Sequence, residues 1–197
     1  MAKTICLLGV DGSGKSTLVH EICEQFRQKG VDARSYYFGW QPFLPTTRLF
    51  SRMFRKHNYR ITDQFNKKNA PFSILQELTL CYFFVEYLAR YLYVRLAQRS
   101  SFLVFDRYFY DIYTHYSYAE RSIIFPLLLN IFPRPHHLFV LDVSSDVACR
   151  RKPEMPLEMV KAHRNRYLAL AQKLKAPVVL TDKPVQATVS TIMEAIG

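Results

Sequence analysis

The sequence predicts an α/β domain in which a parallel sheet carries helices on both faces. Short apolar runs alternate with longer stretches of helical periodicity through the 197 residues, and this alternation is typical of parallel sheets. A glycine-rich segment joins the first apolar run to the first helical stretch, as in the strand–loop–helix unit that binds phosphate groups. The length and an apolar content of 49% indicate a single domain over residues 1–197 with a full core.

The expected strands and helices follow from this alternation of patterns. Five apolar runs are expected to form strands, at residues 5–8, 33–38, 102–106, 138–143 and 177–180. The expected helices cover residues 18–29, 71–99, 109–132 and 157–174, with a last helix starting from 182–184. Gly30 is expected to cap the first helix. The carboxyl ends of parallel strands meet at one edge of a sheet, where ligands bind in folds of this class.

The glycine-rich segment reads Gly9-Val10-Asp11-Gly12-Ser13-Gly14-Lys15-Ser16-Thr17 and fits G-x-x-x-x-G-K-[ST], the phosphate-binding P-loop. Its glycines let backbone N–H groups crowd around phosphate oxygens, and the helix that follows adds the positive end of its dipole. We expect this whole segment to bind a nucleoside triphosphate, with Lys15 on the β- and γ-phosphates and the Ser16 hydroxyl on Mg²⁺.

A second candidate site lies at the end of the apolar run 102–106, where Asp106 is followed directly by Arg107. In P-loop proteins a carboxylate at this place lies beside the Mg²⁺–phosphate site. Asp106 is therefore a candidate metal ligand together with Ser16, and Arg107 a candidate cation for a phosphate group. The alternative is a structural Asp–Arg pair.

The segment from about 149 to 157 carries three consecutive cations, Arg150-Arg151-Lys152. We interpret it as a lid that closes and presents Arg150 and Arg151 to the transferring phosphoryl group. The alternative is an ordinary surface turn that leads into the charged helix 157–174.

Aromatic and aliphatic side chains dominate the expected helix 71–99. Seven of them recur at three- and four-residue steps: Leu75, Leu78, Tyr82, Val85, Leu88, Leu92 and Leu96. Such a row is typical of a core or of a helix–helix interface. A homodimer through this helix is therefore a hypothesis, and Glu86, Arg90 and Arg95 argue against a membrane span.

The net charge of +11 favours partners that carry negative charge. Residues 48–68 hold seven basic side chains and one acid, Asp63. This stretch is either a solvated basic loop or a contact for phosphate or an anionic surface. No nucleic-acid partner is expected, because no nucleic-acid-binding motif is present.

The four cysteines form no C-x-x-C pair, and we expect free thiols, three of them in the core, in a reducing compartment. The first apolar run is too short for a signal peptide. Both features predict a cytoplasmic protein.

The motifs resemble the thymidylate kinase family, through residues 10–17, through Asp106-Arg107-Tyr108, and through Arg150-Arg151-Lys152. The resemblance implies sheet order 2-3-1-4-5, ATP as donor, and an acceptor bound across the P-loop. It also implies that Asp11 contacts the acceptor sugar, that Arg107 holds the acceptor phosphate, and that lid arginines stabilise the transferring phosphoryl group.

The chain departs from this family on the acceptor side. Trp40-Gln41-Pro42 replaces an Arg-Glu-Pro-like segment, and residues 84–87, Phe-Val-Glu-Tyr, stand where the family has an Asp-Arg pair. Asp111 and His115 stand near the place where the family contacts thymine. Trp40, Tyr108 and Tyr116 are expected to stack on a ring or to line an apolar pocket.

These observations predict an ATP–Mg²⁺-dependent kinase that phosphorylates a small-molecule acceptor, with a nucleoside monophosphate, thymidylate above all, as the leading hypothesis. Its predicted catalytic residues are Lys15, Asp106, Arg107, Arg150 and Arg151. The alternatives are a nucleoside, a sugar phosphate or a lipid-linked acceptor, or a nucleotide-gated binding protein without kinase activity.

Overall fold

The computed structural model describes residues 2–48 and 74–197, which fall into two compact units. The first unit holds the residues up to Gly39 together with Ser100–Thr114 and Pro135–Gly197. The second holds Trp40–Arg99, as far as it is described, and His115–Arg134. Most of the basic stretch 48–68 and the expected start of the long helix at Pro71 lie outside the described residues.

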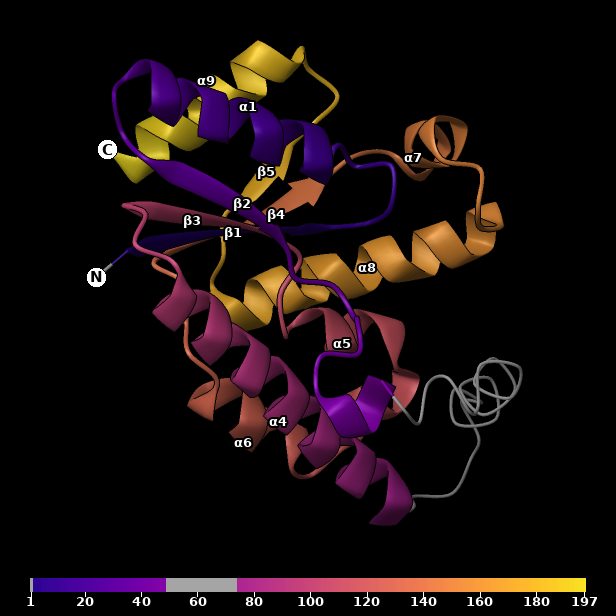
Figure 1. Cartoon of the computed structure of the whole chain (residues 1–197). Coiled ribbons are helices and arrows are strands. Elements are labelled where there is room, and N and C mark those ends of the chain that lie inside the picture. The colour runs from indigo at the N-terminus through magenta and orange to yellow at the C-terminus, as the bar shows by residue number, and fades with distance from the viewer. Residues whose placement is uncertain (1, 49–73) are drawn as a thin grey trace. The chain divides into compact units, whose positions relative to one another are not determined.

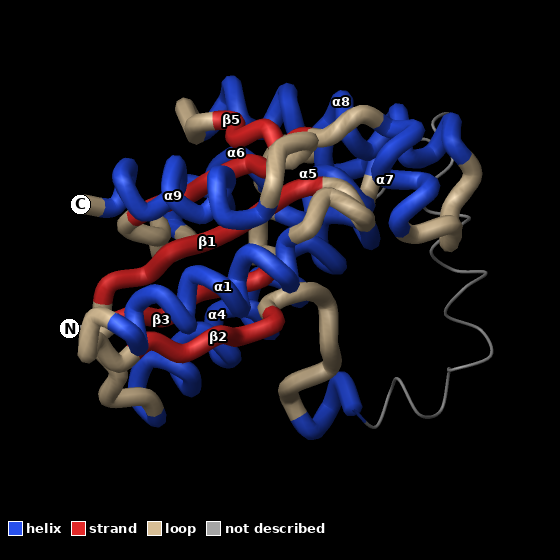
Figure 2. The backbone as a smooth tube through the Cα atoms, turned by 90° about the horizontal axis from the view of Figure 1, so that it is seen from above, coloured by secondary structure: helices blue, strands red, loops and turns tan. Residues whose placement is uncertain are grey.

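A five-stranded sheet forms the centre of the first unit (Figure 2). Its order is β2-β3-β1-β4-β5 and every neighbouring pair is parallel, so the predicted order is confirmed. β1 lies in the middle, where Leu7 pairs with Asp106 of β3 and with Phe139 of β4. The strands are β1 (Lys3–Gly9), β2 (Ala33–Tyr37), β3 (Phe102–Asp106), β4 (His137–Asp142) and β5 (Val178–Leu180).

Helices cover both faces of this sheet. Those of the first unit are α1 (Lys15–Gln28), α7 (Ser145–Arg151), α8 (Leu157–Leu174) and α9 (Val185–Ile196), with α5 (Asp111–His115) at its border. α1 and α9 pack together on one face, and α8 packs on the other (Figure 1). Ile5 and Leu7 are alternate residues of β1, so their side chains lie on the same face of the sheet. Both belong to the core cluster that contains Ile22 of α1. Burying one such side chain stabilises the fold by roughly 1.5–3 kcal/mol.

Two glycines set the ends of α1. Gly14 precedes the helix with φ +87°, and Gly30 follows it with φ +71°. Both angles lie in the left-handed region, which side chains rarely adopt. The Gly30 N–H donates to the Arg27 carbonyl at 2.9 Å, so the predicted cap is confirmed.

The second unit is built around α4 (Ile74–Ala97), which packs on α6 (Phe125–Ile131). Of the two alternatives for the row from Leu75 to Leu96, the structure excludes the core, and the helix–helix interface remains a hypothesis. Six of those seven side chains are exposed, and the buried face consists of other residues: Gln76, Glu77, Leu80, Phe83, Glu86, Tyr87, Tyr91 and Val94. Because apolar side chains occur on both faces of α4, periodicity alone identifies the helix but not its buried side.

The expected single helix 109–132 is also wrong. The chain forms α5, a short 3-10 helix η1 (Ser117–Glu120) and α6 in its place. Glu77 of α4 accepts hydrogen bonds from the Ser122 hydroxyl at 2.6 Å and from the Ile123 N–H at 3.1 Å, so this backbone is satisfied without a continuous helix. Pro126 lies in the first turn of α6, where proline fits because its missing N–H would have no partner within the helix.

No helix in the described parts of the chain is long and apolar enough to cross a membrane. All four cysteines are free, as expected. Cys6 and Cys23 are buried, whereas Cys81 and Cys149 are half-buried, so two thiols rather than three belong to the core.

Candidate active site

The P-loop connects β1 to α1 in the first unit, and close contacts require two of its glycines, Gly9 and Gly12. A Cβ atom on Gly9 would lie 2.6 Å from the Leu141 carbonyl oxygen, and one on Gly12 would lie 2.3 Å from that of Ala148. Gly9 and Gly12 also have φ angles of +148° and +84°. The neighbouring backbone of β4 and α7 therefore leaves no room for a side chain at either position.

Lys15 starts α1 and is buried. Its ammonium group donates to the carbonyl oxygens of Gly9 at 2.8 Å and Val10 at 2.7 Å. Burial, and then the positive charge of Arg107, lower the pKa of Lys15 to about 8, against the opposing effect of Asp11. The P-loop backbone folds around this ammonium group, so Lys15 is buried although it stands at the start of a helix.

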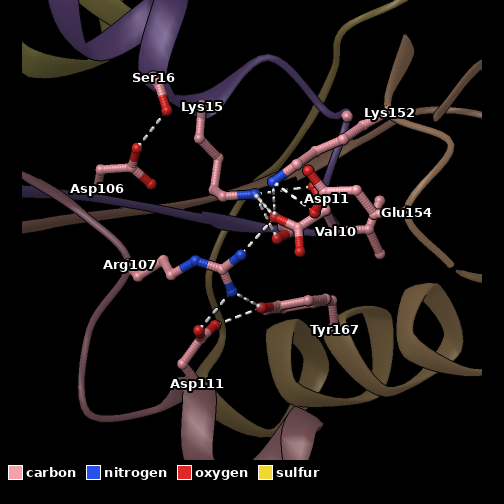
Figure 3. Close-up of polar contacts among 12 residues, drawn as sticks. Val10, Asp11, Lys15, Ser16, Asp106, Arg107, Asp111, Lys152, Glu154 and Tyr167 are labelled. Carbon is pink, nitrogen blue, oxygen red and sulfur yellow. Dashed lines mark hydrogen bonds and ion pairs between the residues drawn. The ribbon is translucent and has the colours of Figure 1, made fainter. Parts of the chain in front are cut away.

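Ser16 and Asp106 meet at the carboxyl end of β3. The Ser16 hydroxyl donates to Asp106 Oδ2 at 2.6 Å (Figure 3). The other carboxylate oxygen, Oδ1, is buried and has no hydrogen-bond partner among the described residues. A hydroxyl and a carboxylate with an unused buried oxygen suit Mg²⁺, which binds proteins through few ligands and takes the rest from phosphates and water. These two residues therefore fit the predicted metal site.

Arg107 follows β3 in a conformation that is unusual for a residue with a side chain, φ +72°. The left-handed region costs roughly 1–2 kcal/mol for such a residue. Its N–H donates to the Leu7 carbonyl at 3.0 Å, and its guanidinium group is held on both terminal nitrogens. Nη2 donates to Asp11, and Nη1 donates to Asp111 Oδ2 at 2.6 Å and to the Tyr167 hydroxyl at 3.4 Å.

This cluster is buried and strongly polarised. Tyr167 of α8 donates its hydroxyl to Asp111, and burial, followed by Asp111, raises the pKa of Tyr167 well above its ordinary value. Burial alone would lower the pKa of Arg107, but Asp111, Tyr167 and Asp11 raise it, so the guanidinium stays charged. Arg107 is thus a fixed positive charge beside the P-loop.

The three cations of the lid segment have different surroundings. Arg150 and Arg151 form the last turn of α7, and both are exposed. Arg151 donates to the carbonyl oxygens of Gly12 and Thr181 at 3.4 Å. The Arg150 side chain makes no hydrogen bond or ion pair with any residue that the structure describes. Lys152 lies 3.7 Å from Asp11 Oδ1 and 3.3 Å from Glu154 Oε2.

The aromatic residues expected to line a pocket are placed differently. Tyr108 is fully buried among Phe38, Phe105 and Tyr110, so its expected contact with a ligand ring is wrong. Trp40 and Tyr116 belong to the second unit, where both rings pack against Phe83.

The predicted residues from Gly9 to Thr17 therefore lie in one loop and one helix start, with Asp106 and Arg107 beside them. Three residues of the same cluster were missed as site residues: Asp111, Lys152 and Tyr167. Two signals in the sequence were available. Asp111 lies near Arg107, and Lys152 directly follows the two arginines of the lid segment.

The chain is similar to known proteins in sequence and in fold. No protein-family model matches the sequence. The chain is 25% identical to a probable thymidylate kinase of Sulfurisphaera tokodaii in an alignment of 213 positions, gaps included, which covers 98% of each protein. The chain resembles a thymidylate kinase over nearly its whole length. This confirms the resemblance that the motifs indicated.

A solved structure of deoxyadenosine kinase from M. mycoides with bound dATP superposes with a TM-score of 0.58 at 14% identity and covers 98% of both chains. At this identity the likeness concerns the fold alone, which is that of P-loop kinases.

Proposed function

We propose that the protein is a kinase that transfers the γ-phosphoryl group of ATP to a nucleoside monophosphate, with thymidylate as the first acceptor to test. The observation that carries the proposal is the meeting of three groups at adjacent strand ends. These are the P-loop with Lys15, the Ser16–Asp106 pair, and the charged Arg107. The relative described as a probable thymidylate kinase supports the choice of acceptor.

In this reaction an oxygen of the acceptor forms a bond to the γ-phosphorus, the bond from that phosphorus to the bridging oxygen breaks, and ADP leaves. The protein has little covalent chemistry to do, so it aligns the reactants and neutralises charge. Lys15 would exchange its two carbonyl partners for phosphate oxygens. Ser16 and Asp106 would hold Mg²⁺, which neutralises charge on the phosphates when bound.

Arg107 would receive the acceptor phosphate, because a guanidinium offers two parallel N–H donors to a phosphate group. Its present partners, Asp11 and Asp111, hold it in place until that exchange. Arg150 and Arg151 would act on the transferring phosphoryl group when the segment 149–157 closes. We place the reaction in the cytoplasm, where free thiols such as the four cysteines stay reduced.

A nucleoside is a second candidate acceptor, and the same cluster favours it. Both terminal nitrogens of Arg107 already bind carboxylates, so little positive charge is left over for a phosphate dianion. A neutral acceptor hydroxyl would need only a carboxylate that accepts its proton, and Asp11 lies beside the P-loop lysine at 4.0 Å.

The experiment is a panel of acceptors scored for ADP formation with ATP and Mg²⁺. It includes thymidylate, the other nucleoside monophosphates, the nucleosides and several sugar phosphates. We expect turnover with thymidylate and only a modest preference for it, since Asp111 and His115 stand where the family contacts thymine. Turnover with nucleosides alone would favour the second candidate. Absence of turnover with all nucleosides and nucleotides would reject both.

A further inference from the structure

Asp11 is the point at which three cations of the first unit converge. Arg107, Lys152 and Lys15 all approach the same oxygen, Oδ1, the latter two at 3.7 and 4.0 Å. Lys15 and Arg107 are buried, whereas the Lys152 side chain is 42% exposed. Lys152 is therefore the outermost partner of Asp11 and comes from a segment that the sequence predicts to be a lid.

The local backbone explains why Lys152 and Arg151 have different contacts. α7 rests on the P-loop through Ala148, whose carbonyl group occupies the space beside Gly12. The helix ends at Arg151, and Lys152 leaves the helical conformation with φ −144° and ψ +86°. Arg151 consequently reaches Gly12 and Thr181, while Lys152 reaches Asp11.

We propose that Lys152 is a positioning residue for the acceptor, which acts by neutralising Asp11 when Arg107 turns to the acceptor phosphate. This inference rests on the proposed function. A partly buried carboxylate that loses its cation beside phosphate groups is costly, because its charge is then uncompensated. Lys152 keeps Asp11 paired, so Arg107 can be shared with the acceptor.

The first test is steady-state kinetics and calorimetric titration of Lys152→Ala. We expect the KM for thymidylate to rise about tenfold while the Kd for ATP changes by less than about twofold. Lys152→Arg should restore most of the affinity, since it keeps the charge. Lys161→Ala is the matched control, because Lys161 is another exposed lysine of the same unit, paired with Glu158 at 2.9 Å. It should leave both constants unchanged.

A double-mutant cycle separates this role from a general loss of positive charge. In an Asp11→Asn background there is no carboxylate to neutralise, so Lys152→Ala should add less than about a twofold further rise in KM. Equal effects of Lys152→Ala in both backgrounds, or a parallel loss of ATP affinity, would overturn the proposal. Arg151→Ala should lower kcat rather than raise the acceptor KM.

A measurement without turnover keeps the inference testable if the proposed function fails. Amide hydrogen exchange at positions 152, 154 and 155 should become faster in Lys152→Ala and in Asp11→Asn, because the ion pair ties this segment to the P-loop. Unchanged exchange in Lys152→Ala would overturn the inference whatever the acceptor is. A wild-type enzyme that is inactive on the whole panel would instead reject the proposed function.

Discussion

The two units bury charged side chains for different purposes. In the first, the buried Asp106 and Arg107 lie beside the P-loop, and Asp111 and Asp11 are bound by the guanidinium of Arg107. In the second, buried Glu77 and Glu86 of α4 accept hydrogen bonds from backbone N–H groups of other segments. At the candidate active site, the buried Arg107 therefore binds charged side chains. In the second unit, the buried glutamates bind backbone N–H groups and so fix the architecture.

Glu86 illustrates the architectural use. Its carboxylate accepts from the N–H groups of Phe43 and Leu44 and from the Thr47 hydroxyl, the last at 2.8 Å. These residues lie at the start of the helical turn 45–48, where N–H groups lack partners within the helix. Glu86 stands in the region where the family carries an Asp-Arg pair, and here it binds the backbone of its own unit.

The largest effect is expected at the P-loop lysine. Lys15→Ala should lower kcat by about 10³-fold or more, because the phosphates lose their main cation. The fold should remain intact, since the lowered pKa of Lys15 shows that burial disfavours its charge. A turnover assay measures the fall in kcat, and thermal unfolding shows whether the fold is intact. Near-normal turnover in a folded Lys15→Ala protein would reject the P-loop assignment.

Arg107→Ala should raise the acceptor KM and lower kcat, by about 10²-fold in kcat/KM, with ATP affinity little changed. The control is Arg164→Ala in the same unit. Arg164 binds Asp142 through two hydrogen bonds of 2.6 and 2.8 Å, an ion pair that lies outside the Arg107 cluster. We expect that control to lower stability without raising the acceptor KM. If both variants raised the acceptor KM equally, the assignment of acceptor binding to Arg107 would be wrong.

Glu86→Ala should lower the free energy of unfolding of the second unit by about 2–3 kcal/mol, because two backbone N–H groups and a hydroxyl lose their acceptor. ATP affinity should not change. Urea unfolding and nucleotide titration measure the two quantities. Glu194→Ala, an exposed glutamate on α9, is the control and should change stability by less than about 0.5 kcal/mol. A loss of ATP affinity without a loss of stability would contradict the architectural role.

Lys15 also makes nucleotide binding depend on pH. Phosphate binding favours its protonated form, so the Kd for ATP should rise above pH 8, by about tenfold per pH unit at most. Stability should respond with the opposite sign. Between the folded value of about 8 and the ordinary value of 10.5 the unfolded chain binds the extra proton, so this group favours folding as pH rises. Lys15→Arg should abolish the pH dependence of ATP binding. If the pH dependence persists in this variant, Lys15 is not the titrating group.

Substitutions on the exposed face of α4 are expected to have the smallest effect on the stability of the monomer. We propose that this face forms a homodimer, because Leu75, Leu78, Tyr82, Val85, Leu92 and Leu96 form an uncharged row at heptad-like steps. Leu78→Asp with Val85→Asp should convert a dimer to a monomer in sedimentation experiments, with stability changed by about 0.5 kcal/mol at most. Leu127→Asp on α6 is the control, since Leu127 is 58% exposed and Leu78 60%. A monomeric wild-type protein would refute this proposal.

The sequence alone determined the sheet and the position of the P-loop. Strand order followed from the motif resemblance, and the P-loop was predictable because its function needs consecutive residues with fixed local conformations. Asp106 and Arg107 were placed beside it because parallel strands end at one edge of a sheet. These features depend on residues that are adjacent in the chain or on the topology of neighbouring strands.

Only the tertiary structure decided the rest. The buried face of α4 was not predictable, because both its faces are apolar and packing selects one. The region 109–132 forms shorter helices, and between η1 and α6 the Ser122 hydroxyl and the Ile123 N–H bind Glu77, about 45 residues earlier in the chain. Lys152 and Tyr167 joined the Arg107 cluster through the packing of α7 and α8, which brings side chains from distant parts of the chain within reach of one carboxylate or one guanidinium.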